Sequence, residues 1–172
     1  TGLLLLRSLV TVGAALILTW LCVSRGARPL ATIGVGALGL FAARPLFNDR
    51  PQIVSILFFT AMLALIEMCE RGRERRLMIA PLLMIAWVNL HGGFIFGPAL
   101  LILYGICCTP RWWRQLQAGR TLRPTPTMLA GAIVLSLAAC LINPHGVAGA
   151  TYPLGYVFGE NAVSYTHLRA HE

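Results

Sequence analysis

The stretch WVNLHGGFIFG, residues 87–97, joins two apolar segments, residues 77–88 and 94–108, that contain no charged residue. Its polar and flexible residues are Asn89, His91, Gly92 and Gly93. They stand where an apolar chain has to reverse direction, and an amide or imidazole is costly in lipid unless it faces a cavity or another polar group. The stretch therefore predicts a turn at one surface of a helical membrane protein, with side chains that suit a polar pocket.

Composition supports lipid as the solvent of this chain. Of its 172 residues, 57% are hydrophobic and only 12% are charged, and the mean hydropathy is +0.73. Soluble domains are about one quarter charged. The net charge of +8 comes from arginine, because the chain contains no lysine.

Six apolar segments predict an all-α, polytopic transmembrane helix bundle. They cover residues 3–23, 29–43, 53–69, 77–88, 94–108 and 128–142. Only the first has the roughly 20 residues that span a hydrocarbon core of about 30 Å. The other helices have to borrow flanking residues or stop short of one surface. Residues 29–43 and 77–88 give the weakest case for a full crossing, and residues 77–90 also fit a buried or re-entrant helix.

The arginines predict an orientation. Ten of them fall in the loops after the first, third and fifth apolar segments: Arg25, Arg28, Arg71, Arg73, Arg75, Arg76, Arg111, Arg114, Arg120 and Arg123. If all six segments cross, only Arg7, Arg44 and Arg50 lie on the opposite side. Arginine in short loops marks the cytoplasmic side of a membrane protein. We therefore predict a multi-pass membrane protein whose ten-arginine side is cytoplasmic.

Trp112 and Trp113 stand beside arginines in the last of these loops. Aromatic and basic side chains occur together on nucleic-acid-binding surfaces. They also anchor helices at the membrane interface, where the basic residues meet anionic headgroups. Because this loop joins two apolar segments, we predict interfacial anchoring and no nucleic-acid partner.

The five cysteines lie in or at the ends of apolar segments, and none has metal-ligand spacing. They are predicted to be free thiols. At the C-terminal end, residues 163–172 resemble the translation of a sequencing-library adapter. We exclude them from functional interpretation, so that His167 and His171 are not taken as metal ligands. Residues 1–162 are expected to be a transmembrane piece of a longer protein.

The predicted topology gathers polar residues at the extracytoplasmic surface. They are Arg44, Asn48, Asp49, Arg50, Gln52, Asn89, His91, Asn143 and His145. Polar groups at this depth are functional candidates by default. Structural interpretations stay open: Arg44 and Arg50 can extend to headgroups, and Asn143 before a proline can simply end a helix. His91 can likewise be a turn residue bonded to a nearby carbonyl.

Three motifs carry a resemblance to a known family. They are Arg50-Pro51-Gln52 at the start of an apolar helix, W-x-N-x-H-G-G-F at residues 87–94, and Asn143-Pro144-x-Gly146. Together, over residues 44–155, they resemble bacterial multi-spanning glycosyltransferases of the GT-C superfamily, which includes protein mannosyltransferase-like and aminoarabinose transferase-like enzymes. The chain departs from this pattern at His145, where an aromatic residue is expected.

The resemblance implies transfer of a sugar from a polyprenyl-phosphate donor on the extracytoplasmic face, with membrane lipids as further partners. Arg44 and Arg50 would bind the lipid phosphate, since guanidinium groups bind phosphate in bidentate fashion. Asp49, the only acid on that face within the matched region, would take the proton of the acceptor. The remaining substrate-binding candidates are Gln52, Asn89, His91, Asn143 and His145. Because GT-C enzymes usually place their acid in the first outer loop, a structural or metal-binding role for Asp49 stays open.

Two other functions fit the same residues. A transporter or flippase for a lipid-linked or small polar substrate would use the same polar cluster, with Glu67 on its pathway. A non-catalytic scaffold would use the polar residues only to end helices. Glu67 is expected to pair with the arginines that follow it, with a proton-relay role as the alternative. No metal site is indicated, although a divalent ion is compatible with the resemblance, and no oligomeric state is defined.

Overall fold

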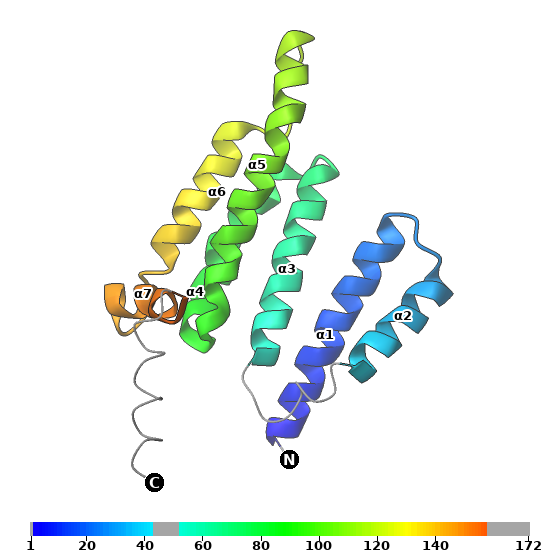
Figure 1. The fold of residues 1–172 in the computed structure, drawn as a ribbon, viewed down its shortest axis with the longest axis vertical. Coiled ribbons are helices and arrows are strands. Elements are labelled where there is room, and N and C mark those ends of the chain that lie inside the picture. Colours follow the sequence, from blue (N-terminus) through cyan, green and yellow to red (C-terminus); the bar gives the residue numbers. More distant parts are fainter. Residues whose placement is uncertain (1, 43–51, 158–172) are drawn as a thin grey trace, which may run out of the picture.

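The computed structural model describes residues 2–42 and 52–157, and these residues are helical without any strand (Figure 1). The elements, in chain order, are α1 (Gly2–Ser24), α2 (Pro29–Ala42), α3 (Gln52–Glu70), the 3₁₀ helix η2 (Glu74–Ile79), α4 (Ala80–Leu90), the 3₁₀ helix η3 (Gly92–Ile95), α5 (Phe96–Gln117), α6 (Pro126–Ala139) and α7 (Gly146–Val157). The prediction of an all-α fold is confirmed.

Three of the described helices are long and apolar enough to cross a membrane. They are Arg7–Ser24 within α1, Gln52–Glu70, which is α3, and Gly92–Gln117, which joins η3 to α5. Helices α2 and α6 are apolar but have only 14 residues each. Helix α4 has 11 residues, a length of about 17 Å. The predicted count of six crossings is therefore not confirmed.

Several helix ends differ from the sequence prediction. Helix α5 continues past residue 108 to Gln117 and includes Pro110. Helix α6 ends at Ala139 rather than at residue 142, and the chain then turns toward Asn143. The N–H groups of Cys140, Leu141 and Ile142 each bond the carbonyl three residues back (3.0–3.2 Å), so a tighter turn replaces the last α-helical turn that the sequence predicted. Helix α7 was not predicted.

Glycines with positive φ end α3 and α5. Gly72 has a φ of 83° and donates its N–H to Cys69 O (2.9 Å), and Gly119 has a φ of 63° and donates to Leu116 O (3.0 Å). A left-handed residue just past a helix satisfies carbonyls that the helix leaves free, and glycine adopts it without steric cost. These two glycines turn the chain back toward the bundle.

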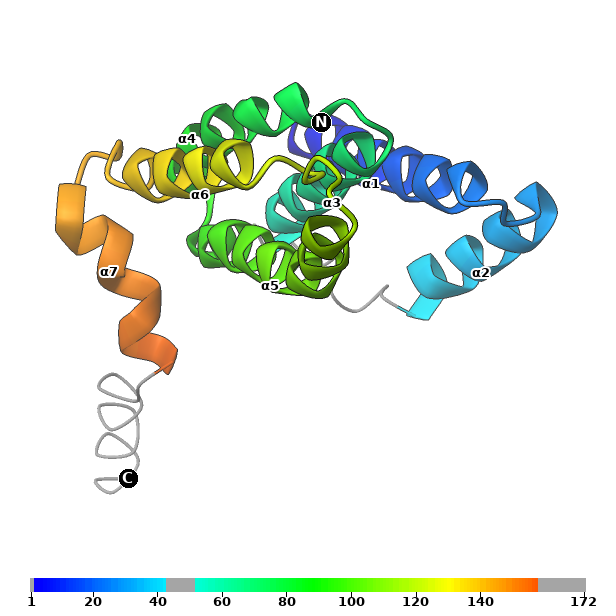
Figure 2. The same cartoon turned by 90° about the horizontal axis from the view of Figure 1, so that it is seen from above.

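Successive helices from α1 to α6 run in alternating directions (Figure 1). Helix α3 packs against α1, α4 and α5, and α6 packs against α4 and α5. Helix α2 packs against α1 at the edge of the bundle, and α7 lies on the opposite side from α2 (Figure 2). The bundle therefore has two ends, and each connection whose residues the structure describes lies at one of them.

The core lies between α3, α4, α5 and α6. Its fully buried side chains include Met62, Leu77, Met84, Trp87, Leu101 and Leu129. The Trp87 ring stacks on Phe58 with 5.6 Å between ring centroids. By contrast, only 6% of the Arg7–Ser24 window is buried. Many large apolar side chains of α1 and α2 are therefore exposed, among them Leu9, Leu30 and Phe41.

Candidate functional site

Five of the eight predicted site residues lie in the described part of the chain: Gln52, Asn89, His91, Asn143 and His145. Arg44, Asp49 and Arg50, together with Asn48, lie outside the described residues. The five come from the start of α3, the end of α4 with the turn after it, and the α6–α7 connection. All of these segments lie at one end of the bundle (Figure 1), which we call the histidine end.

Asn89 joins two of these segments. Its Nδ2 donates to Ile85 O (2.7 Å) within α4 and to Ile142 O (2.8 Å) in the connection after α6. The residue is exposed, and no described residue bonds its Oδ1. Asn89 therefore links the end of α4 to the connection after α6 through its amide nitrogen, while its carbonyl oxygen is not bonded by any described residue.

The His91 side chain is held by two contacts at one ring nitrogen. Its Nδ1 lies 2.6 Å from Ser55 Oγ of α3 and accepts the backbone N–H of Gly93 (3.0 Å). Ser55 Oγ in turn accepts the indole N–H of Trp87 (2.8 Å). Ser55 was missed in the sequence prediction. Its only signal was a hydroxyl at the start of an apolar helix, and nothing in the sequence names its partners.

The glycine pair has a more specific role than a flexible turn. Neither Gly92 nor Gly93 has a positive φ. A Cβ on Gly93 would overlap Ser55 Oγ, whereas a Cβ on Gly92 would meet nothing within 4 Å. Gly93 is therefore required because Ser55 approaches the backbone closely.

The side chain of Asn143 makes all its hydrogen bonds to described residues within the α6–α7 connection. Its Nδ2 donates to Cys140 O and Gly146 O (both 2.9 Å), and its Oδ1 accepts the N–H of His145 (2.8 Å). A Cβ on Gly149 would overlap Oδ1. These contacts give Asn143 a structural role in the turn that follows α6, and this role needs no ligand. His145 itself is exposed.

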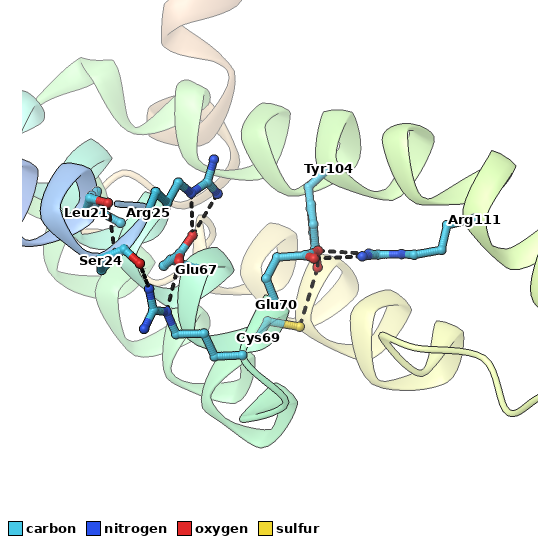
Figure 3. A network of polar contacts seen from close by, with 9 residues as sticks. Leu21, Ser24, Arg25, Glu67, Cys69, Glu70, Tyr104 and Arg111 are labelled. Carbon is cyan, nitrogen blue, oxygen red and sulfur yellow. Dashed lines mark hydrogen bonds and ion pairs between the residues drawn. The ribbon is translucent and has the colours of Figure 1, made fainter. Parts of the chain in front are cut away.

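The opposite end of the bundle carries the ten arginines, and we call it the arginine end. Glu67 is buried, with 4% of its surface exposed. One carboxylate oxygen accepts a hydrogen bond from Arg25 Nε (2.7 Å), and the other accepts one from Arg71 Nε (2.9 Å) (Figure 3). Arg71 also donates to Ser24 O. The prediction that Glu67 pairs with a following arginine is confirmed, and Arg25 adds a bond from α1 to α3.

Glu70 makes the corresponding bond from α3 to α5. Its two oxygens accept Arg111 in bidentate fashion (2.7 and 2.8 Å), and one of them also accepts the hydroxyl of Tyr104 (Figure 3). Beside this pair lies a cavity of about 50 Å³, lined by Cys69, Glu70, Gly72, Glu74, Arg111, Arg123 and Pro124. It has room for a few water molecules at most and not for a sugar.

Glu74 joins η2 to the start of α6. Its carboxylate accepts the backbone N–H of Thr125 (2.7 Å). This hydrogen bond holds the pKa of Glu74 below its ordinary value of 4.5. The three glutamates of the arginine end thus each connect two helices.

Replacing Glu74 by glutamine is expected to lower the free energy of unfolding by no more than about 1 kcal/mol at neutral pH, because the carboxylate is partly exposed. The folded-state pKa is the lower one, so the bond contributes fully above pH 4.5 and is lost as the pH falls through the lowered value. Chemical unfolding of both proteins in detergent should show the difference shrinking between about pH 7 and about pH 3. A difference that stays constant over this range would contradict the role assigned to the carboxylate.

The described residues contain no group of three or more histidine, cysteine, aspartate or glutamate side chains that could hold a metal ion. The five cysteines are free thiols, as predicted. Among the described residues, the histidine end offers the imidazoles of His91 and His145, the carboxamides of Gln52, Asn89 and Asn143, the Ser55 hydroxyl and backbone groups.

The chain was compared with known proteins in three ways. No protein-family model matches it, and neither curated proteins nor solved structures give a match. Its function has to be inferred from the arrangement of its own residues, and no family assignment is made.

Proposed function

We propose that this chain is the membrane part of a GT-C-like glycosyltransferase of the bacterial inner membrane, which binds a polyprenyl-phosphate-linked sugar at the histidine end. The observation that carries the proposal is the separation of polar groups between the two ends of an apolar bundle. Neutral hydrogen-bonding groups gather at one end, and ten arginines occupy the other. A polyprenyl-phosphate-linked sugar has an apolar lipid tail and a polar sugar-phosphate head. Its binding therefore needs a polar end beside an apolar surface.

The membrane setting rests on three membrane-length helices and on the apolar surface of α1 and α2. Leu9, Leu30 and Val35 are each 70% exposed or more. In water this surface would favour aggregation, whereas in lipid it is the required exterior. The alternating directions of α1 to α6 are compatible with α2, η2–α4 and α6 as three further crossings. The arginine end then lies in the cytoplasm and the histidine end outside.

Donor binding would draw on residues that the histidine end leaves available. These are the imidazole of His91, the carbonyl oxygen of Asn89 and the side chain of Gln52. The chain between α2 and α3 carries Arg44, Asp49 and Arg50, and both flanking helix ends lie at the histidine end (Figure 1). Arg44 and Arg50 would bind the lipid phosphate, and Asp49 would accept the proton of the incoming hydroxyl.

The proposal is tested by binding of a polyprenyl monophosphate to the purified chain in lipid nanodiscs, with the matching polyprenol as the uncharged control. We expect the phosphate to bind at least tenfold more tightly than the alcohol, because charge-assisted bonds to phosphate are the strong ones. Arg50→Ala should weaken phosphate binding by about tenfold. Arg28→Ala should leave binding unchanged, since Arg28 is exposed at the other end of α2.

Two results would contradict the proposal. One is equal affinity for the phosphate and the alcohol, and the other is an equal loss in Arg50→Ala and Arg28→Ala. Movement of the lipid across proteoliposomes would instead support the transporter. The structure offers that alternative little support, because both oxygens of Glu67 are bonded to arginines that connect α1 and α3.

A further inference from the structure

We propose that Ser55 is a positioning residue which, together with Trp87 and Gly93, holds neutral His91 with its proton on Nε2. The imidazole then offers a hydrogen-bond donor, and not a base, to an oxygen of the lipid-phosphate ligand. The identity of that ligand rests on the proposed function. The position of the proton rests only on contacts within the chain.

The hydrogen-bond donors around His91 determine which of its two ring nitrogens carries the proton. An indole N–H can only donate, so Ser55 Oγ is the acceptor in its bond with Trp87 (2.8 Å). The hydroxyl proton of Ser55 is then free to point at His91 Nδ1, 2.6 Å away. The backbone N–H of Gly93 also points at Nδ1 (3.0 Å) and can only donate.

Two donors therefore meet at Nδ1, which must present its lone pair. In a neutral imidazole one nitrogen carries the proton and the other accepts, and the bond made by one nitrogen fixes the state of the other. The proton is thus on Nε2. No hydrogen bond from Nε2 to another described residue is found, and the His91 side chain is partly exposed at the end of the bundle.

The positioning residues are themselves fixed by packing. Trp87 is fully buried and stacks on Phe58 at an interplanar angle of 14°. Gly93 lies so close to Ser55 Oγ that a Cβ would overlap it. Ser55 comes from α3 and Trp87 from α4, so the packing of these two helices sets the direction of the imidazole. Because the imidazole is already held in one orientation, its N–H group loses little entropy when it bonds a phosphate or sugar oxygen.

This arrangement assigns the roles at the proposed site. A nitrogen that already carries a proton cannot take one from the incoming hydroxyl. Proton acceptance is therefore left to a carboxylate, and His91 binds. Exchange of the imidazole for a side chain without an outward donor should reduce ligand affinity while leaving the inner hydrogen bonds intact.

The position of the proton can be measured without a ligand. Protein labelled with ¹⁵N-histidine, in detergent at a pH where imidazole is neutral, should give the nitrogen shifts of an Nε2–H imidazole for His91, assigned by their loss in His91→Gln. Ser55→Ala should shift these signals, because Nδ1 then keeps only the Gly93 N–H as a hydrogen-bond donor. Ser136→Ala is the matched control, because Ser136 is fully buried and its hydroxyl bonds none of the described residues. An Nδ1–H imidazole in the unmodified protein, or an unchanged spectrum in Ser55→Ala, would overturn the proposal.

Binding of polyprenyl monophosphate tests the consequence. His91→Asn keeps an oxygen at the position of Nδ1 but lacks the outward donor, so it should fold normally and lose about tenfold in affinity. Ser55→Ala should lose two- to tenfold, roughly one ordinary hydrogen bond. If the unmodified protein binds and His91→Asn binds equally well, the donor role is wrong. If the unmodified protein does not bind but its proton lies on Nε2, the proposed function fails and the positioning by Ser55 stands.

Discussion

Replacing Trp87 by alanine is expected to lower the free energy of unfolding by about 3–5 kcal/mol. Trp87 is fully buried in the core and stacks on Phe58, and its indole N–H donates to Ser55 Oγ. The substitution removes the largest buried side chain of the bundle, leaves a cavity and deprives Ser55 of its donor. Unfolding of the purified protein in detergent micelles by a denaturant, followed by circular dichroism, measures the difference.

The chain offers a matched control for this substitution. Trp113 is 65% exposed at the end of α5. Trp113→Ala should therefore change the free energy of unfolding by less than about 0.5 kcal/mol, as expected for a surface position. If the two alanine variants were equally stable, the core described between α3, α4, α5 and α6 would be wrong.

The second large effect is expected at Gly93. A methyl group there would overlap Ser55 Oγ and lie 3.1 Å from His91 Nδ1. Gly93→Ala should cost about 1–3 kcal/mol, because the hydroxyl, the imidazole or the backbone of η3 has to move. Gly92→Ala, next to it in the chain, should be nearly neutral because a Cβ there meets no atom within 4 Å.

A double substitution separates steric overlap from other effects. Ser55→Ala removes the oxygen that a Cβ at Gly93 would overlap. The combined variant should thus be less destabilised than the sum of the two single variants, as contacting residues are coupled in this way. Additive losses in the double-mutant cycle would show that Gly93 is required for a reason other than its contact with Ser55.

Much of the helical architecture could be predicted from the apolar segments alone. The structure has a helix at each of the six, and the described residues that connect them gather at two ends. The lengths of the helices were predicted less accurately. Helix α5 continues through Pro110, and the Thr109 hydroxyl donates to Ile106 O (2.8 Å), the carbonyl that Pro110 cannot bond. Beyond the proline, Arg111 bonds Glu70 on α3, a contact that no local pattern contains. Helix α7 was missed because residues 146–157 mix glycine, proline and polar residues with apolar ones.

The candidate site could be predicted only in outline. The polar residues around His91 are visible as exceptions in an apolar sequence, and the structure brings Asn89 to the connection after α6, next to Asn143. What each residue does depends on its partners. Ser55 gave no signal by itself, since a single serine in an apolar helix can bond to its own backbone. The two carboxamides look equivalent in sequence, but the bonds of Asn143 lie within one turn, whereas Asn89 joins two segments.

The placement of polar contacts at the two ends of the bundle has a consequence for how the protein tolerates change. Ser55 and Glu70 belong to the same helix but are about 22 Å apart along it. No described side chain bonds to both, and the residues between them are mostly apolar. Substitutions at one end should therefore be thermodynamically independent of those at the other. Residues at the histidine end can then be exchanged while the glutamate–arginine contacts at the arginine end still hold the helices together.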